Sequence, residues 1–227
     1  AEPLEVMKLT QNRRDTDARV REIAAKCRLN LEHLRRFPHA FSGGQRQRIS
    51  IARALVSGPK FIVADESVAA LDVSIQADVL NLLKELQRDL GITFMFISHD
   101  LSVVAHTCDH VAVMYLGRLV ETAPTRKIFA APRHPYTRAL FSAIPSLDPD
   151  SSDRAQKLEG EIPSPTNQPT GCKFHTRCPH VIDRCRKEEP ALEQPGDGVS
   201  WTAIVLGAAS TLLAFGLLAL SSTPALM

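Results

Sequence analysis

Two short apolar runs on either side of an amphipathic segment constrain the fold of this chain more than any other feature. The runs cover residues 61–64 and 92–97. Short uninterrupted apolar runs are typical of strands that are buried in a parallel sheet. Residues 73–90 between them repeat apolar side chains at helical spacing and stop at Gly91, a residue type that is common at helix ends. The sequence therefore predicts an α/β fold with a mainly parallel sheet.

Polar side chains follow each apolar run: Asp65 and Glu66 after the first, and His99 shortly after the second. Open α/β sheets bind ligands beside the carboxyl ends of their strands, and carboxylates there are costly unless a cation or a polarised water uses them. In nucleotide hydrolases one such acid holds Mg²⁺ and its neighbour orients the attacking water. We predict that Asp65 holds the metal, that Glu66 serves the water and that His99 donates a hydrogen bond to a terminal phosphate. The alternative for the two acids is that they cap the next helix.

A turn-forming segment upstream, Ser42-Gly43-Gly44-Gln45, is here called the SGGQ turn. Two adjacent glycines allow backbone N–H groups to approach an anion, because no Cβ atom obstructs them. The residues after the turn repeat apolar side chains at helical spacing, and a helix that begins there adds unpaired N–H groups and the positive end of its dipole. The turn is therefore predicted to bind phosphate. The alternative is an ordinary helix that begins at a serine cap.

Taken in order, these segments resemble the ATP-binding subunit of an ABC transporter. The SGGQ turn resembles the signature motif, which contacts the γ-phosphate of ATP held by the opposite subunit. Asp65 and Glu66 resemble the Walker B motif, Ala70-Leu71-Asp72 the D-loop, and His99 the switch histidine. The resemblance implies ATP and Mg²⁺ as cofactors and two subunits that share two sites. It implies catalytic roles for Glu66 and His99, a metal role for Asp65, and nucleotide contacts for Ser42, Gly43, Gly44, Gln45 and Asp72.

Longer segments narrow the resemblance to the subgroup that powers the import of dipeptides, oligopeptides and sometimes nickel into bacteria. These segments are residues 33–55, 70–87, 111–121 and 134–145. The resemblance implies a second ATPase subunit in a homodimer or heterodimer, transmembrane permease subunits and, indirectly, an extracytoplasmic substrate-binding protein. It implies no nucleic-acid partner and a peripheral position on the cytoplasmic face of the inner membrane. Ser67 and Ala69 depart from the subgroup, which usually has proline and serine at these positions.

The phosphate-binding loop Gly-x-x-x-x-Gly-Lys-Ser/Thr, the Walker A motif, occurs nowhere in the 227 residues. The resemblance implies an N-terminal truncation of roughly a hundred residues, since a whole domain is typically longer. We therefore expect little or no ATPase activity from this polypeptide alone. Two classes of function stay open: a fragment of an ATPase subunit that energises peptide import, and an inactive remnant that binds permease or an intact partner. A soluble ABC ATPase that acts on nucleic acid or ribosomes is a further alternative.

Composition, pattern and the resemblance together imply that the chain has four parts. We predict a helical subdomain over residues 1–57, ending in the helix after the SGGQ turn, and an α/β core over residues 58–130 that is an incomplete P-loop NTPase. Residues 131–195 are predicted to form a small irregular C-terminal extension of the peptide-importer type, and residues 196–227 are an atypical hydrophobic tail. The alternating pattern around Gly117 predicts a hairpin, and Pro135 predicts the start of a helix. A net charge of +2 indicates no strong nucleic-acid surface.

Cys172, Cys178 and Cys185 lie close together in the predicted extension. In a reducing compartment, spaced cysteines favour soft-metal ligation over disulfides, and this spacing is not that of a zinc ribbon. The resemblance implies a four-iron four-sulfur cluster in some members, with a fourth cysteine a little downstream. This chain has Gly-Val-Ser-Trp over residues 198–201 in that neighbourhood. Cluster ligation by the three cysteines and free thiols therefore both stay open.

Residues 201–220 contain no charged side chain and are numerous enough to cross a bilayer as a helix. Three interpretations compete for this stretch: a membrane anchor that inserts in lipid, a buried helix, and a foreign or frame-shifted end on a truncated gene. We favour the last, because the composition changes where the family's last cysteine is expected.

Overall fold

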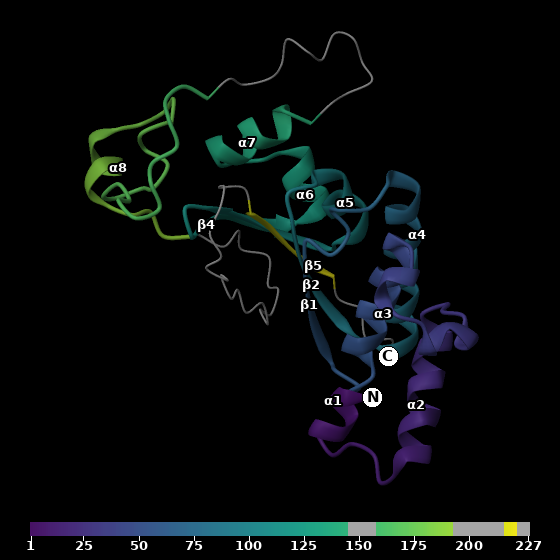
Figure 1. Ribbon diagram of the computed structural model, residues 1–227. Helices are drawn as coiled ribbons and strands as arrows, with labels where there is room; N and C mark the ends of the chain where they lie inside the picture. The colour runs from purple at the N-terminus through teal and green to yellow at the C-terminus, as the bar shows by residue number, and fades with distance from the viewer. Residues whose placement is uncertain (145–157, 193–215, 222–227) are drawn as a thin grey trace, which may run out of the picture. The chain divides into compact units, whose positions relative to one another are not determined.

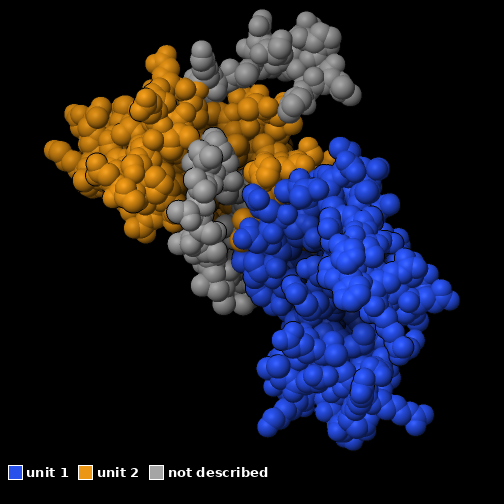
Figure 2. All heavy atoms as spheres, viewed as in Figure 1, with its two compact units in different colours: residues 1–95, 221–227 blue, residues 96–220 orange. Residues whose placement is uncertain are grey.

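The computed structural model describes residues 1–144, 158–192 and 216–221. Residues 1–95 with 221–227 form one compact unit, and residues 96–220 form the other. Figure 2 colours them as unit 1 and unit 2. Each unit is described by itself below.

Unit 1 begins with helices. They are α1 (Glu2–Val6), α2 (Arg13–Lys26), two 3₁₀ helices (Leu31–Arg35 and Pro38–Ala40) and α3 (Gly43–Leu55). α2 begins after Asn12, whose side chain accepts a hydrogen bond from the N–H of Asp15 at 3.0 Å, as an N-cap residue does. The apolar core between these helices consists of Leu4, Ile23, Ala24, Cys27, Ile51, Leu55 and Val56.

The predicted strand–helix–strand segment is present as β1 (Phe61–Asp65), α4 (Val73–Leu90) and β2 (Thr93–Ser98) (Figure 1). α4 buries Val79, Leu82, Leu83 and Leu86, which the helical spacing places on one face. It ends at Gly91, whose φ of 62° lies in the left-handed region that glycine adopts at little cost. β1 and β2 are hydrogen-bonded neighbours, and a helix that connects adjacent strands makes them parallel. The α/β fold class is thereby confirmed.

The prediction that the first strand is buried is wrong. Only Ala64 of β1 is buried, whereas Phe61 is 46% exposed and Val63 is 48% exposed. Side chains of a strand alternate between two faces, so one face of β1 packs inward and the other, with Phe61 and Val63, is open among the described residues. The apolar run specifies a strand whose two faces both suit burial, but here only one face is covered.

Unit 2 contains an antiparallel hairpin that matches the predicted one. Asp100 caps α5 (Leu101–Thr107) by accepting hydrogen bonds from two backbone N–H groups, and β3 (His110–Tyr115) and β4 (Arg118–Pro124) follow. The two turn residues, Leu116 and Gly117, have φ of 46° and 77°. Positive φ at both positions is the type I′ geometry that suits the twist of a two-residue hairpin. The register runs from Tyr115 opposite Arg118 to His110 opposite Pro124, with one irregularity between Val113 and Met114.

The described part of unit 2 also contains α6 (Thr125–Ala130), α7 (Pro135–Ser142) and α8 (Asp183–Lys187). α7 begins at Pro135, as predicted. An aromatic cluster holds the otherwise irregular segment 158–192 against this framework: the ring of Phe174 lies 5.2 Å from that of Tyr115 and 5.5 Å from that of Tyr136. Aromatic pairs at such distances bury large apolar areas. Phe174 therefore anchors the cysteine-containing segment.

Most of the hydrophobic tail lies outside the described residues. Residues 216–221 form a strand, β5 (Gly216–Ser221), that pairs antiparallel with β3, so the end of the stretch 201–220 is not helical. Among the residues that the structure describes, no helix is both long and apolar enough to span a bilayer.

Candidate functional site

The SGGQ turn is locked by a reciprocal capping box at the start of α3. The N–H of Gln45 donates to Oγ of Ser42 at 3.3 Å, and the N–H of Ser42 donates to Oε1 of Gln45 at 3.1 Å. Two backbone donors are thereby satisfied, and the entry of the chain into the helix is fixed. Ser42 therefore caps the helix, and Ser42 and Gly43 are exposed at its N-terminus; phosphate binding by the turn stays a prediction.

The two glycines of the turn have different surroundings. A Cβ atom on buried Gly44 would lie 2.6 Å from Cγ2 of Ile75, in the first turn of α4, whereas one on Gly43 would lie 3.5 Å from Cδ2 of Leu71. The first distance is a clash and the second is ordinary contact. Gly44 thus lets α3 pack against α4, and the SGGQ turn lies beside the Leu71-Asp72 turn. The structure therefore brings together two of the segments that the sequence predicts to form the site.

Asp65 and Glu66 lie at the carboxyl end of β1, and both are exposed. Neither caps the next helix, because the N-cap of α4 is Asp72, so the capping alternative is wrong. Glu66 has a φ of 45°, in the left-handed region that costs a residue with a Cβ atom roughly 1–2 kcal/mol. Strain of this kind concentrates at functional sites. Two exposed carboxylates on a strained strand end are a donor set that fits Mg²⁺ and water.

Asp72 is exposed at the start of α4, where its side chain makes no capping hydrogen bond. His99 follows the last residue of β2 and is exposed in unit 2, while the other nucleotide-site candidates belong to unit 1. Its neighbour Asp100 donates its N–H to Oγ of Ser98 at 3.0 Å, which fixes the backbone on both sides of the histidine.

Two of the three cysteines of the C-terminal segment, Cys172 and Cys185, are joined by a backbone hydrogen bond. The N–H of Cys172 donates to the carbonyl of Cys185 at 2.8 Å, and Nδ1 of His175 lies 2.9 Å from the carbonyl of Cys172. Burial, together with the nearby thiols of Cys185 and Cys178, raises the pKa of the Cys172 thiol, which disfavours the thiolate that metals bind. Within 1–144, 158–192 and 216–221, no group of three or more His, Cys, Asp or Glu is placed to hold a metal ion. The described residues thus do not fit a four-iron four-sulfur cluster.

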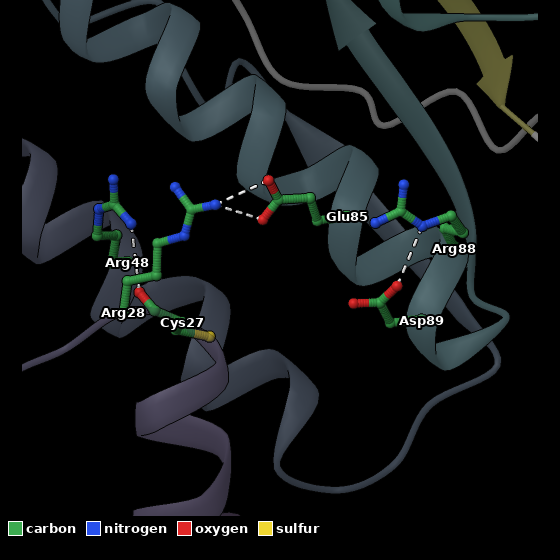
Figure 3. Close-up of polar contacts among 6 residues, drawn as sticks. All are labelled: Cys27, Arg28, Arg48, Glu85, Arg88 and Asp89. Atoms are coloured by element: carbon green, nitrogen blue, oxygen red, sulfur yellow. Dashed lines mark hydrogen bonds and ion pairs between the residues drawn. The ribbon is translucent and has the colours of Figure 1, made fainter.

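Unit 1 also contains an ion pair that no sequence motif predicts (Figure 3). Nη2 of Arg28 lies 2.7 Å from Oε1 and 2.5 Å from Oε2 of Glu85, which joins the segment after the C-cap of α2 to α4. Arg48 on α3 donates from Nη1 to the carbonyl of Cys27 at 3.4 Å. Both contacts link helices that support the SGGQ turn, and no local pattern relates residues so far apart in the sequence.

Two family models match the chain. One, described as ABC transporter, matches residues 2–69, which include the SGGQ turn and both acids. The other, described as oligopeptide/dipeptide transporter, C-terminal region, matches residues 120–185, which include the three cysteines.

Similar proteins carry related names. The dipeptide transport ATP-binding protein of Haemophilus influenzae is 53% identical over 180 residues, which are 79% of this chain and 55% of that protein. The di/tripeptide transport ATP-binding protein of Pseudomonas aeruginosa is 49% identical over 192 residues, 85% of this chain and 59% of that protein. The chain thus spans between half and two thirds of the length of these relatives.

A solved structure shares the fold. It is cbiO1 of Clostridium perfringens, part of an ABC transporter complex, with a TM-score of 0.50 and 32% sequence identity over 56% of this chain and 50% of that one. The chain belongs to the ATP-binding subunits of ABC transporters, in the group of the peptide importers.

Proposed function

We propose that this chain is part of an ATP-binding subunit that energises di- and oligopeptide import across the bacterial inner membrane. The observation that carries the proposal is the SGGQ turn, which is rigid through its capping box, packed against the Leu71-Asp72 turn, and exposed at Ser42 and Gly43. An exposed helix N-terminus of fixed geometry suits the phosphates of a nucleotide that another subunit holds. The names of the relatives support peptides as the transported class.

Each site residue has a proposed role in phosphoryl transfer to water. Asp65, at the end of β1, holds Mg²⁺, which when bound neutralises charge on the phosphates. Glu66 orients the attacking water and takes up its proton, and His99 donates a hydrogen bond to the terminal phosphate. Ser42, Gly43, Gly44, Gln45 and Asp72 contact the nucleotide across the interface with a second subunit.

This polypeptide alone is proposed to be nearly inactive as an ATPase. The sequence contains no Gly-x-x-x-x-Gly-Lys-Ser/Thr loop, so nothing in it supplies the backbone cradle and lysine that hold the β- and γ-phosphates. An intact partner subunit supplies that loop. The partner's ATP then needs from this chain only the SGGQ turn and the adjacent Asp72.

The permease is proposed to dock on the helices of unit 1. A cavity of about 490 Å³ lies among α2, the 3₁₀ segments and α3, and its apolar wall includes Ile23, Leu29, Leu34, Phe41, Ile49 and Val56. An apolar groove of this kind takes a short amphipathic helix of a partner. Peripheral attachment to the membrane follows from this contact.

Complementation with an intact subunit tests the proposal. The intact partner carries a substituted serine in its own signature motif, and its ATPase rate is measured with and without this chain. We expect this chain to restore hydrolysis, Ser42→Arg to abolish the restoration, and Ser50→Arg, on an exposed position of the same helix, to preserve it. Glu66→Gln in this chain is also expected to preserve it, because the partner hydrolyses its own ATP.

Two results would contradict the proposal. Failure of the unaltered chain to restore any hydrolysis would leave the inactive remnant as the better account. ATP hydrolysis by this polypeptide alone, lost on Glu66→Gln, would overturn the claim that it is inactive by itself.

A further inference from the structure

A cavity of about 840 Å³ in unit 2 follows the edge of β4. Its wall includes six consecutive residues of this strand, 118–123. Alternate side chains of a strand point to opposite faces of its sheet, so a cavity lined by consecutive residues runs along the strand's edge and not over one face. Residues 133–135, Cys172 with Lys173, and residues 189–192 line the cavity as well.

β4 has one strand partner among the described residues. β3 pairs with β4 on one side and with β5 on the other, so no described strand pairs with the outer edge of β4. Such an edge presents a row of backbone N–H and C=O groups and is a template for strand addition. The register shift opposite Val120 is a bulge, so a regular ladder would form only on either side of it.

The lining of the cavity is cationic. Its basic side chains are Arg118, Arg126, Lys127, Arg133 and Lys173. Its two carboxylates already have partners: Glu189 pairs with Arg118 at 3.2 Å, and Glu121 accepts hydrogen bonds from the backbone N–H groups of Arg133 and His134 at 2.8 and 3.0 Å. Because basic side chains outnumber carboxylates in the lining, its net charge is positive, which favours an acidic ligand.

We propose that this cavity, here called the β4 groove, binds an extended acidic segment of a partner protein, which adds to β4 as a strand. The backbone edge of β4 supplies hydrogen bonds to the added strand, and the basic side chains select carboxylates on it. Buried Ile128 also lines the groove and can contact the apolar side chains that alternate with these carboxylates in the bound segment. A small anion could pair with the basic side chains, but it is too short to form hydrogen bonds along the strand edge. The inference concerns residues other than those of the nucleotide site and stands independently of the ATPase proposal.

Labelled peptides of about ten residues test the proposal by fluorescence anisotropy with the full chain. The first alternates valine and glutamate. The second replaces glutamate with lysine, and the third keeps glutamate but carries N-methyl groups on alternate residues, which removes one row of N–H donors. We expect the first to bind at least about tenfold more tightly than either of the others. Equal binding of the lysine peptide would overturn the charge argument, and equal binding of the N-methylated peptide would overturn strand addition.

Variants locate the binding. The double variant Arg126→Glu with Arg133→Glu is expected to bind the valine–glutamate peptide about tenfold more weakly or worse. Arg14→Glu with Arg21→Glu makes the same change of charge on exposed positions of α2 in unit 1 and is expected to leave affinity unchanged. An equal loss of peptide affinity in both double variants would show that the peptide does not bind in the β4 groove. Circular dichroism checks that both double variants fold. If the first one misfolds, the comparison of the valine–glutamate peptide with its N-methylated form on the unaltered protein still tests strand addition.

Hydrogen exchange of the amides of residues 118–123 gives a readout independent of charge. We expect exchange at these amides to slow when the valine–glutamate peptide is added and not when inorganic phosphate is added. Protection that is already complete in the free protein would mean that the chain covers its own edge, and the proposal would fail. No binding by any peptide would overturn it outright.

Discussion

Gly44 and Ile75 approach so closely that a Cβ atom on the glycine would lie 2.6 Å from Cγ2 of the isoleucine. This contact sets the distance between α3 and the first turn of α4. It therefore also sets the position of the SGGQ turn relative to Asp72. The same feature that shapes the proposed nucleotide site thus contributes to packing of unit 1.

Gly44→Ala is expected to destabilise unit 1 by about 1–3 kcal/mol, the usual cost of overpacking. Alanine gains up to about 1 kcal/mol over glycine in helix propensity, so the clash is the larger effect. Gly43→Ala, with 3.5 Å of space, is the matched control and is expected to be neutral or stabilising. Urea unfolding measures both. The double variant Gly44→Ala with Ile75→Ala tests the cause: less than the sum of the two single losses supports the clash, and simple additivity contradicts it.

The ion pair of Arg28 with Glu85 is expected to contribute little, about 0–1 kcal/mol. Its side chains are 51% and 41% exposed, so water and salt screen the attraction. A double-mutant cycle with Arg28→Ala and Glu85→Ala measures the coupling, which should shrink as salt is added. The pair of Arg88 with Asp89, whose side chains are more exposed, is the control and should show less coupling. A coupling of several kcal/mol that salt leaves unchanged would show that the pair is not screened as its exposure implies.

Local patterns in the sequence predicted the elements that local physics determines. α4 follows from apolar side chains at helical spacing and from Gly91, and the hairpin follows from alternation around Gly117. The prediction that β1 is buried is wrong. An apolar run shows that both faces of a strand suit burial, but it does not show which other elements cover each face. The contact of Arg28 with Glu85 joins residues whose only relation is tertiary.

In the proposed site, too, the local structure could be predicted from the sequence and the tertiary contacts could not. Motif order placed Asp65 at the end of a strand and Ser42 at the start of a helix, since both positions follow from local structure. The roles of these residues stay predictions, because they depend on a second subunit that the sequence of one chain does not specify. The cysteine spacing could not reveal that burial would raise the pKa of Cys172, because burial depends on the tertiary packing of the segment.

Gly171→Ala is expected to loosen the cysteine segment. Gly171 has a φ of 62°, and a Cβ atom there would lie 2.5 Å from the carbonyl oxygen of Cys185, a backbone atom that cannot rotate away. The bond from the N–H of Cys172 to that carbonyl should break, and iodoacetamide should alkylate Cys172 faster. Gly117→Ala is the control, since its φ of 77° imposes similar backbone strain but no atom lies within 4 Å of the added Cβ. Equal acceleration in both variants would contradict a role for the clash.

Cys27 makes stability depend on pH in the alkaline range. Burial raises the pKa of its thiol from 9.0 to about 11, and the charge of Arg48 offsets this only in part. The unfolded chain loses this proton at lower pH than the folded chain, so the contribution is fully present below pH 9 and is lost as pH rises toward 11. By pH 10 the loss is about 1 kcal/mol. Urea unfolding at pH 8 and pH 10 measures it, and Cys27→Ala should lower stability at both pH values but reduce the difference between them. An unchanged difference in the variant would show that other groups, such as Tyr136 with its pKa raised to about 12 by burial, cause the alkaline loss.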